Sequence, residues 1–152
     1  MSRARRSVIV GAVISAALAT GLFIAGCDRD PSTQEIVATA PAAGHAAEAR
    51  LQITYPSEGT LFPPESVAPT FVWEDMTGNV DRWFVVVRDA TGGTVLSGAV
   101  DAPRWRPSEE GWRQIKRQSA ERDAEVIVAG VDRTKRATLL SSARVHIRTS
   151  KD

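Results

Sequence analysis

Among the residues of this sequence, the single cysteine, Cys27, gives the clearest indication of a chemical modification. The chain has 152 residues and a single cysteine, and the segment Ile24-Ala25-Gly26-Cys27 ends a stretch without charge. An aliphatic residue and two small residues before a cysteine are the lipobox pattern, in which a peptidase cuts before the cysteine and its thiol takes a diacylglycerol. Because a lone thiol has no partner within the chain, we predict lipidation of Cys27 rather than a disulfide.

The residues before Cys27 have the layout of an export signal. Arg3, Arg5 and Arg6 make the start basic, and residues 8–26 carry no charge and include a strongly apolar run. This arrangement predicts a signal peptide over residues 1–26. The alternative is an uncleaved anchor, because about 20 apolar residues can span a bilayer. In both cases the positive end stays in the cytoplasm and the remainder is exported.

Lipidation also predicts where the protein is located. Two or more acyl chains give stable attachment, at about 0.8 kcal/mol for each buried CH₂. We therefore expect attachment to the membrane through the lipid on Cys27, and no other cofactor. Asp28 follows the cysteine directly, and an Asp at this position resembles the inner-membrane retention signal of Gram-negative lipoproteins. The sequence favours the periplasmic face of the inner membrane, with the outer membrane as the alternative.

The remaining chain offers few groups for catalysis or metal binding. His45 and His146 are its only histidines, and none of the usual spacings of metal ligands occurs. We expect His146 to be a solvated sheet residue rather than a catalytic base. The acidic pairs at residues 74–75 and 109–110 indicate a turn and a helix start, because adjacent side chains diverge. We predict no catalytic residue, no metal site and no enzymatic activity; an enzyme with an unrecognised site is the disfavoured alternative.

Four tryptophans are the most suggestive side chains for binding. Trp73 and Trp83 lie in apolar segments and are expected in the core. Trp105 and Trp112 border a polar connection, and an exposed Trp can stack on a sugar or anchor a protein partner. We predict a binding surface at these two residues for an envelope protein or a glycan, with core packing as the alternative.

Charge and composition divide the chain further. Three of its 19 basic residues lie in the predicted signal peptide, which leaves 16 against 18 acidic residues. Such a balance does not suggest a nucleic-acid partner.

Residues 27–50 are rich in Ala, Pro, Thr and charge. They cannot bury enough apolar surface to offset the entropy of ordering, so we predict a lipidated, flexible tether followed by one domain over residues 51–152.

The domain has the pattern of an all-β protein. Leu51, Ile53 and Tyr55 alternate with polar residues, and glycines at residues 89–93 indicate a hairpin turn. Residues 108–118 predict a short helix with Ser108 as its N-cap. The expected strands cover residues 51–55, 70–74, 82–88, 94–100, 124–131 and 143–149, with a further short strand at 138–140. Six or seven short strands with regular turns predict a β-sandwich with one short helix.

Several motifs of this domain are similar to a known family. The chain contains Ile53-Thr54-Tyr55-Pro56-x-x-Gly59-Thr60-x-Phe62-Pro63-Pro64, Pro69-Thr70-Phe71-x-Trp73, Trp83, Trp105-x-Pro107 and Trp112-x-x-Ile115-Lys116. These resemble the N-terminal immunoglobulin- or fibronectin III-like region of large exported bacterial proteins of the TolB-like or cytochrome c-type. The resemblance implies an Ig/fibronectin III-like sandwich over residues 51–152. The longer proteins carry a haem-attachment Cys-x-x-Cys-His further on; it does not occur here, so no haem function carries over.

Together these observations predict a membrane-anchored lipoprotein with a non-catalytic β-sandwich that acts as a binding or adaptor module on the periplasmic side. The alternative is the N-terminal fragment of a larger exported protein of the TolB-like or cytochrome type, whose function lies in a continuation of the chain. Such a missing partner would leave a sheet edge or an apolar patch uncovered.

Overall fold

The computed structural model describes residues 50–132, 134 and 138–151. Cys27, Asp28 and His45 lie outside these residues, as do the predicted signal peptide and almost all of the tether. Within the described part of the chain, no helix is long and apolar enough to cross a membrane.

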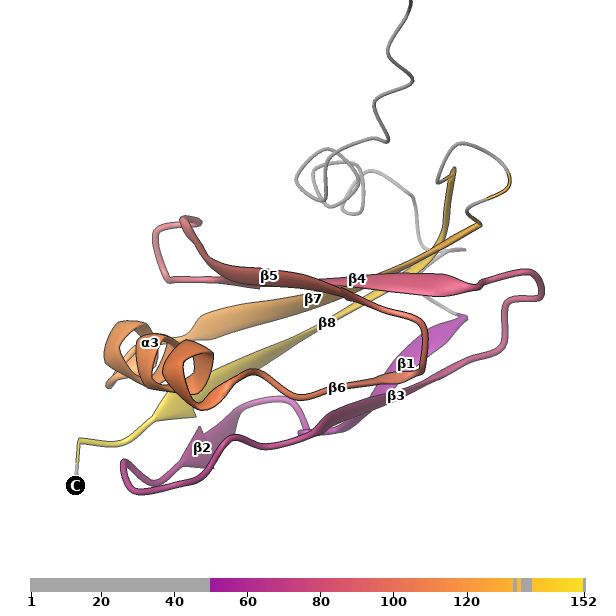
Figure 1. Cartoon of the computed structure of the whole chain (residues 1–152). Coiled ribbons are helices and arrows are strands. Elements are labelled where there is room, and N and C mark those ends of the chain that lie inside the picture. The colour runs from indigo at the N-terminus through magenta and orange to yellow at the C-terminus, as the bar shows by residue number, and fades with distance from the viewer. Residues whose placement is uncertain (1–49, 133, 135–137, 152) are drawn as a thin grey trace, which may run out of the picture.

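The described strands form two sheets (Figure 1). The smaller sheet has the order β1-β3-β6 and the larger one β2-β8-β7-β4-β5. All neighbours are antiparallel except β2 and β8. The strands are β1 (Leu51–Tyr55), β2 (Thr60–Phe62), β3 (Phe71–Asp75), β4 (Arg82–Arg88), β5 (Thr94–Val100), β6 (Arg104–Trp105), β7 (Ala124–Asp132) and β8 (Thr138–Thr149). Two facing sheets with these pairings are an Ig/fibronectin III-like sandwich, which confirms the predicted fold class.

The core lies between the sheets because the inward-facing positions of each strand are apolar. Trp73 of β3 contacts Trp83 of β4, with ring centroids 6.2 Å apart, and both rings are buried as predicted. Valines from the two central strands fill the space around them. The valines are Val85, Val87, Val126 and Val128. β4 is apolar on both faces and lies between β5 and β7, so its predicted central position is confirmed.

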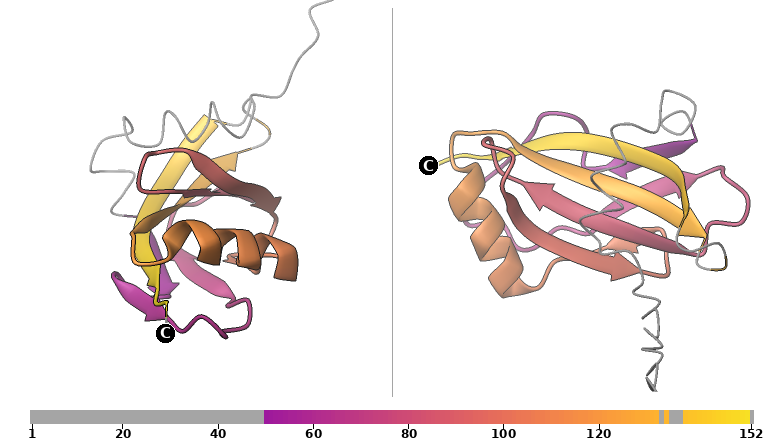
Figure 2. Two further views of the ribbon diagram at one scale, coloured as in Figure 1. Left: turned by 90° about the vertical axis from the view of Figure 1, so that its left-hand side faces the viewer. Right: turned by 90° about the horizontal axis from the view of Figure 1, so that it is seen from above.

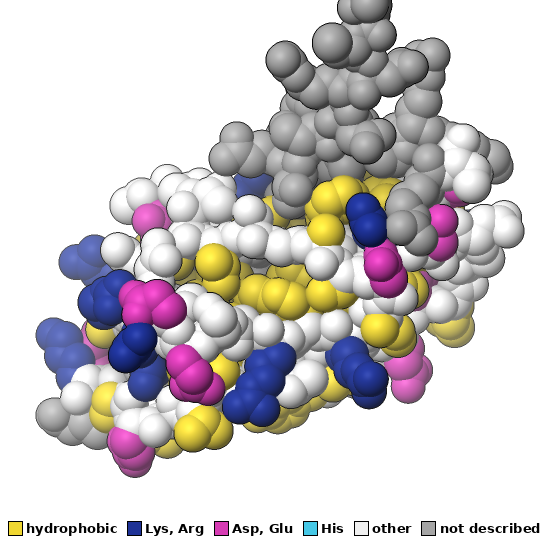
Figure 3. Space-filling view, in the orientation of Figure 1, with side chains coloured by type: hydrophobic (Ala, Val, Ile, Leu, Met, Phe, Trp, Pro, Cys, Tyr) yellow, Lys and Arg dark blue, Asp and Glu magenta, His cyan; other side chains and the backbone are white. Residues whose placement is uncertain are grey.

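Helix α3 (Glu109–Ser119) lies across one end of the sandwich, as the right-hand view of Figure 2 shows. Ser108 is its N-cap and accepts a hydrogen bond from the amide of Gly111 at 3.1 Å, as the sequence predicts. Trp112 on the inner face of the helix donates from Nε1 to the carbonyl of Ser66 at 2.9 Å. The opposite face is charged, and basic and acidic side chains are mixed around α3 (Figure 3).

The sequence prediction divided one continuous strand into two and missed two short strands. The two segments expected at 138–140 and 143–149 form one continuous strand, β8. β2 and β6 were not predicted as strands, because three and two residues are too short to show an alternating pattern. The hairpin at residues 89–93 is confirmed: Gly92 has a φ of +84°, and the amide of Asp89 donates to the carbonyl of Gly93 at 2.9 Å.

A polar contact joins the two sheets beside the tryptophans. Asp75, at the end of β3, accepts hydrogen bonds from Trp83 Nε1 at 3.0 Å and from Ser141 Oγ at 2.5 Å. Its second carboxylate oxygen accepts from the amide of Thr77 at 2.9 Å, which closes a turn. The sequence predicts a turn at residues 74–75, but both residues end strand β3, and the turn follows them. The link from β3 to β4 and β8 was not predicted. We call Asp75, Trp83 and Ser141 the inter-sheet cluster.

Gly130 provides the space that the inter-sheet cluster needs. A Cβ atom at this position would fall against Ser141 Oγ and 2.8 Å from Asp75 Oδ2. We expect Gly130→Ala to lower the free energy of unfolding by about 1–3 kcal/mol, because the new methyl group overpacks the cluster. Urea unfolding followed by tryptophan fluorescence measures the change.

Gly78→Ala is the matched control for this prediction, since a Cβ atom there would meet nothing within 4 Å. Its expected effect is within about 0.5 kcal/mol. Equal stabilities of the two variants would contradict the proposed role of Gly130.

Candidate binding groove between the sheets

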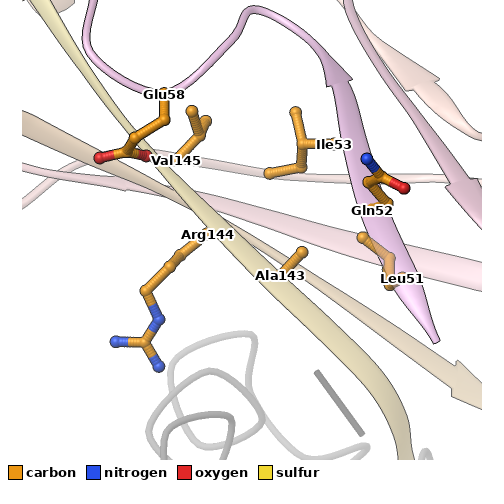
Figure 4. A pocket seen from close by; sticks show the side chains of 7 residues that line it. All are labelled: Leu51, Gln52, Ile53, Glu58, Ala143, Arg144 and Val145. Carbon is orange, nitrogen blue, oxygen red and sulfur yellow. The ribbon is translucent and has the colours of Figure 1, made fainter. Parts of the chain in front are cut away.

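A groove opens where β1 of the small sheet lies beside β8 of the large one. It has a volume of about 370 Å³. We call it the β1–β8 groove (Figure 4). Its lining residues are Leu51, Gln52, Ile53, Glu58, Ala143, Arg144 and Val145.

The groove follows from the alternating pattern of its two strands. Leu51 and Ile53 face inward from β1, and Ala143 and Val145 face inward from β8. Ile53 and Val145 point toward one another across the groove, whereas Arg144 points away from it (Figure 4). Ile53 and Ala143 are only partly buried, so the floor of the groove is apolar and accessible.

Both walls of the groove are strands at the edge of a sheet. β1 pairs with β3 alone, and β2 pairs with β8 only over Ile147–Thr149. β7 pairs with the opposite side of β8 along its length. Within the described ranges, no strand therefore pairs with the second edge of β1 or, on the side away from β7, with residues 139–143 of β8. Edges of this kind can pair with an added extended chain.

One end of the groove is closed by a polar contact with β8. Glu58, in the turn after β1, accepts a hydrogen bond from the backbone amide of His146 at 2.9 Å. Its second oxygen lies 2.8 Å from Nδ1 of His146. The backbone hydrogen bond is the main reason that the pKa of Glu58 lies below its ordinary value of 4.5. His146 is a partly exposed sheet residue, as expected, but its pairing with Glu58 was not predicted.

The structure corrects the binding surface expected at two tryptophans. Trp105 is 9% exposed and packs against Phe71, with ring centroids 5.4 Å apart. Trp112 is 1% exposed and packs edge-on against Phe62 at 5.1 Å. Neither ring presents an open face for stacking, so core packing, the alternative from the sequence, accounts for both.

The groove residues were not recognised from the sequence as a site. Their alternation indicated which side chains face the core, but not that β1 and β8 are neighbours. The described residues contain no group of three or more His, Cys, Asp or Glu side chains that could hold a metal ion.

Comparisons with known proteins give one structural match to report. No family model matches the chain, and no curated protein matches it. Among solved structures, a fibronectin III-like module of CbhA from Clostridium thermocellum is 15% identical. The match covers 66% of this chain and 99% of that one, with a TM-score of 0.38.

The Glu58 contact predicts a pH-dependent contribution to stability. Because the folded-state pKa of Glu58 is lowered, its charged form stabilises the fold above pH 4.5, and this contribution fades as the pH falls through the lowered pKa. We expect Glu58→Gln to be less stable than the wild type at neutral pH by less than about 1 kcal/mol, since the pair is exposed. The difference should shrink as the solution is made more acidic than this lowered pKa.

Thermal unfolding across this pH range measures the effect, with Glu65→Gln as the control at another exposed glutamate. A difference between Glu58→Gln and the wild type that is as large in acid as at neutral pH would contradict the electrostatic origin.

Proposed function

We propose that this protein is a lipid-anchored, non-catalytic binding module on the periplasmic side of the membrane, and that its β1–β8 groove takes an extended segment of a protein partner. The observation that carries the proposal is the groove itself, which combines two neighbouring strand edges with an accessible apolar floor. An extended peptide that pairs with a strand edge can place alternate side chains on such a floor.

The lining of the groove favours a polypeptide over a glycan. Sugars are commonly held by stacking on exposed aromatic rings, and the groove is lined by aliphatic and polar side chains instead. The two tryptophans that were candidates for stacking, Trp105 and Trp112, are buried. Apolar partner side chains fit Ile53 and Ala143, which are partly exposed, while Glu58 and Gln52 offer polar contacts at the border.

The anchored location rests on the sequence around the lone cysteine. Cys27 in its lipobox would carry the lipid, and Asp28 would keep the protein in the inner membrane. A lipid at this position places the domain beside other proteins of the envelope, where a partner with an extended segment would bind.

Site-specific crosslinking tests the groove. With a photo-crosslinking amino acid at the exposed position Gln52, we expect a defined crosslinked protein in intact cells. Ala143→Glu should reduce the crosslink about tenfold or more, because a charge in the apolar floor would lose its water when the partner binds. Immunoblotting measures the yield, and the thermal midpoint checks that the variant is folded.

Val67→Glu is the matched control, because Val67 is 71% exposed and lies outside the groove. It should leave the crosslink unchanged. A crosslink that survives Ala143→Glu in a folded protein would exclude the groove as the binding site.

Metabolic labelling tests the anchor separately. We expect radioactive or clickable palmitate to enter the wild type and to be absent from Cys27→Ser. We also expect Asp28→Ser to move the protein to the outer-membrane fraction in a Gram-negative host. Labelling of Cys27→Ser at the wild-type level would refute the lipidation of this residue.

A further inference from the structure

The outer face of the small sheet carries the one exposed aromatic ring in the described part of the chain. Tyr55 of β1 is 47% exposed. The other aromatic side chains of residues 50–132, 134 and 138–151 are buried, except Phe84, which is half-buried. An aromatic residue that stays on the surface while the others pack into the sandwich requires a reason of its own.

A β-bulge turns Tyr55 to this outer face. Strict alternation after Ile53 would place Tyr55 against the core. Ile53 pairs with the buried Trp73, but the register then shifts, and Tyr55 pairs with Val72. Thr54 is the extra residue of the bulge, and its Oγ1 donates a hydrogen bond to the carbonyl of Val72 at 3.1 Å. Bulges at sheet edges can re-aim a side chain, and this one exposes a ring that simple alternation would bury.

Tyr55 is the first residue of a row that crosses all three strands of the small sheet. It pairs with Val72 of β3, and Val72 pairs with Arg104 of β6. All three side chains are exposed, as is Glu74, the next outward residue of β3. Figure 1 shows this sheet as the lower layer, with no described element beneath β1 and β3. We call Tyr55, Val72, Glu74 and Arg104 the small-sheet face.

The charges of the small-sheet face are available to a ligand. Neither Glu74 nor Arg104 has an ion-pair partner among the residues that the structure describes. The face therefore offers a ring, an aliphatic side chain, a planar donor and a carboxylate acceptor within one sheet surface. A saccharide fits this set, because an aromatic ring can stack on the face of a sugar while charged side chains bind its polar groups.

We propose that the small-sheet face binds the glycan strand of peptidoglycan, with Tyr55 stacked on a sugar ring. This strand is a chain of N-acetylated amino sugars whose peptide stems carry free carboxylates. An acetamido methyl group fits Val72, an acetamido N–H fits the carboxylate of Glu74, and a stem carboxylate fits the guanidinium of Arg104. The face and the strand are thus complementary in apolar contact and in charge.

The size of the row and the proposed location both agree with this ligand. Neighbouring strands are about 4.8 Å apart, so the row from β1 to β6 spans roughly 10 Å, which is close to the length of a disaccharide. Peptidoglycan is the polysaccharide that a protein on the periplasmic side of the membrane would meet, so the inference rests on the proposed function for this location. The small-sheet face is separate from the β1–β8 groove, which has no aromatic lining and takes a polypeptide.

Sedimentation with peptidoglycan sacculi tests the small-sheet face. The purified full chain, kept in mild detergent, is mixed with sacculi that SDS and protease have cleared of protein. We expect the wild type to sediment with them and Tyr55→Ala to bind about tenfold more weakly, because the stacking surface is lost. Tyr55→Phe keeps the ring and should bind like the wild type. Leu61→Ala, at a 57% exposed position on β2 of the large sheet, is the matched control and should also bind like the wild type.

A second variant tests the contact with the peptide stems. Arg104→Gln should bind intact sacculi about threefold more weakly, a modest loss because the ion pair would be exposed. It should bind glycan strands freed of their stems by an amidase as well as the wild type does. Thermal midpoints check that each variant is folded, and Tyr55→Gln, which also lacks the ring, replaces Tyr55→Ala if that variant is unfolded.

Four outcomes would overturn the proposal. The first is a wild type that does not sediment with the sacculi, and the second is equal binding by the wild type and a folded variant without the ring. The third is equally strong binding to microcrystalline cellulose, which has neither acetamido groups nor stems. The fourth is binding only to sacculi that still carry protein, which would indicate a protein partner.

The anchor and the groove can be tested independently of the small-sheet face. Ala143→Glu, which should reduce the crosslink in the groove, is expected to sediment with sacculi like the wild type. Cys27→Ser should do so as well, because the solubilised protein meets the sacculi without a membrane. A failure of the anchor or of the groove would therefore leave the sedimentation result unchanged, and a failure of sedimentation would leave the crosslink and the palmitate labelling unchanged.

Discussion

The contact between the two sheets at Trp73 and Trp83 is the interaction on which the rest of this structure depends. The chain has no second cysteine, so a disulfide cannot join the sheets, and burial of large apolar side chains must do so. Asp75 fixes the orientation of the packed rings, because its carboxylate accepts a hydrogen bond from the indole of Trp83 and another from Ser141 of β8. The relative position of β1 and β8, and with it the groove, follows from how these sheets are held.

The sequence predicted the parts of the fold that depend on local patterns. These patterns are the alternation in residues 51–55, the apolar run in residues 82–88, the glycines of the 89–93 turn and the Ser108 cap. Each of them is contained within a few neighbouring residues of the sequence. The inter-sheet cluster was missed because Asp75 bonds to Ser141, 66 positions away. Nothing in an adjacent acidic pair distinguishes a turn from a link between sheets.

The candidate groove could not be predicted from the sequence for a related reason. β1 and β8 come from opposite ends of the domain, and their neighbourhood is a property of topology rather than of either strand. The tryptophans were the more obvious candidates in the sequence. Trp105 and Trp112 nevertheless fill the space between β6, α3 and the sheets, which explains why large aromatic residues occur there. Large aromatic residues beside polar loops indicate packing at the ends of a sandwich as often as they indicate a binding site.

The position of β1 has a mechanical consequence. It is the first strand in the described part of the chain and also one wall of the groove. In the proposed anchored protein, a pull between the membrane and the proposed partner in the groove would therefore run through β1 along its axis, without crossing the core. The hydrogen bonds between β1 and an added chain would be loaded together in shear rather than opened one after another, while the bonds that join β1 to β3 would carry little of the force.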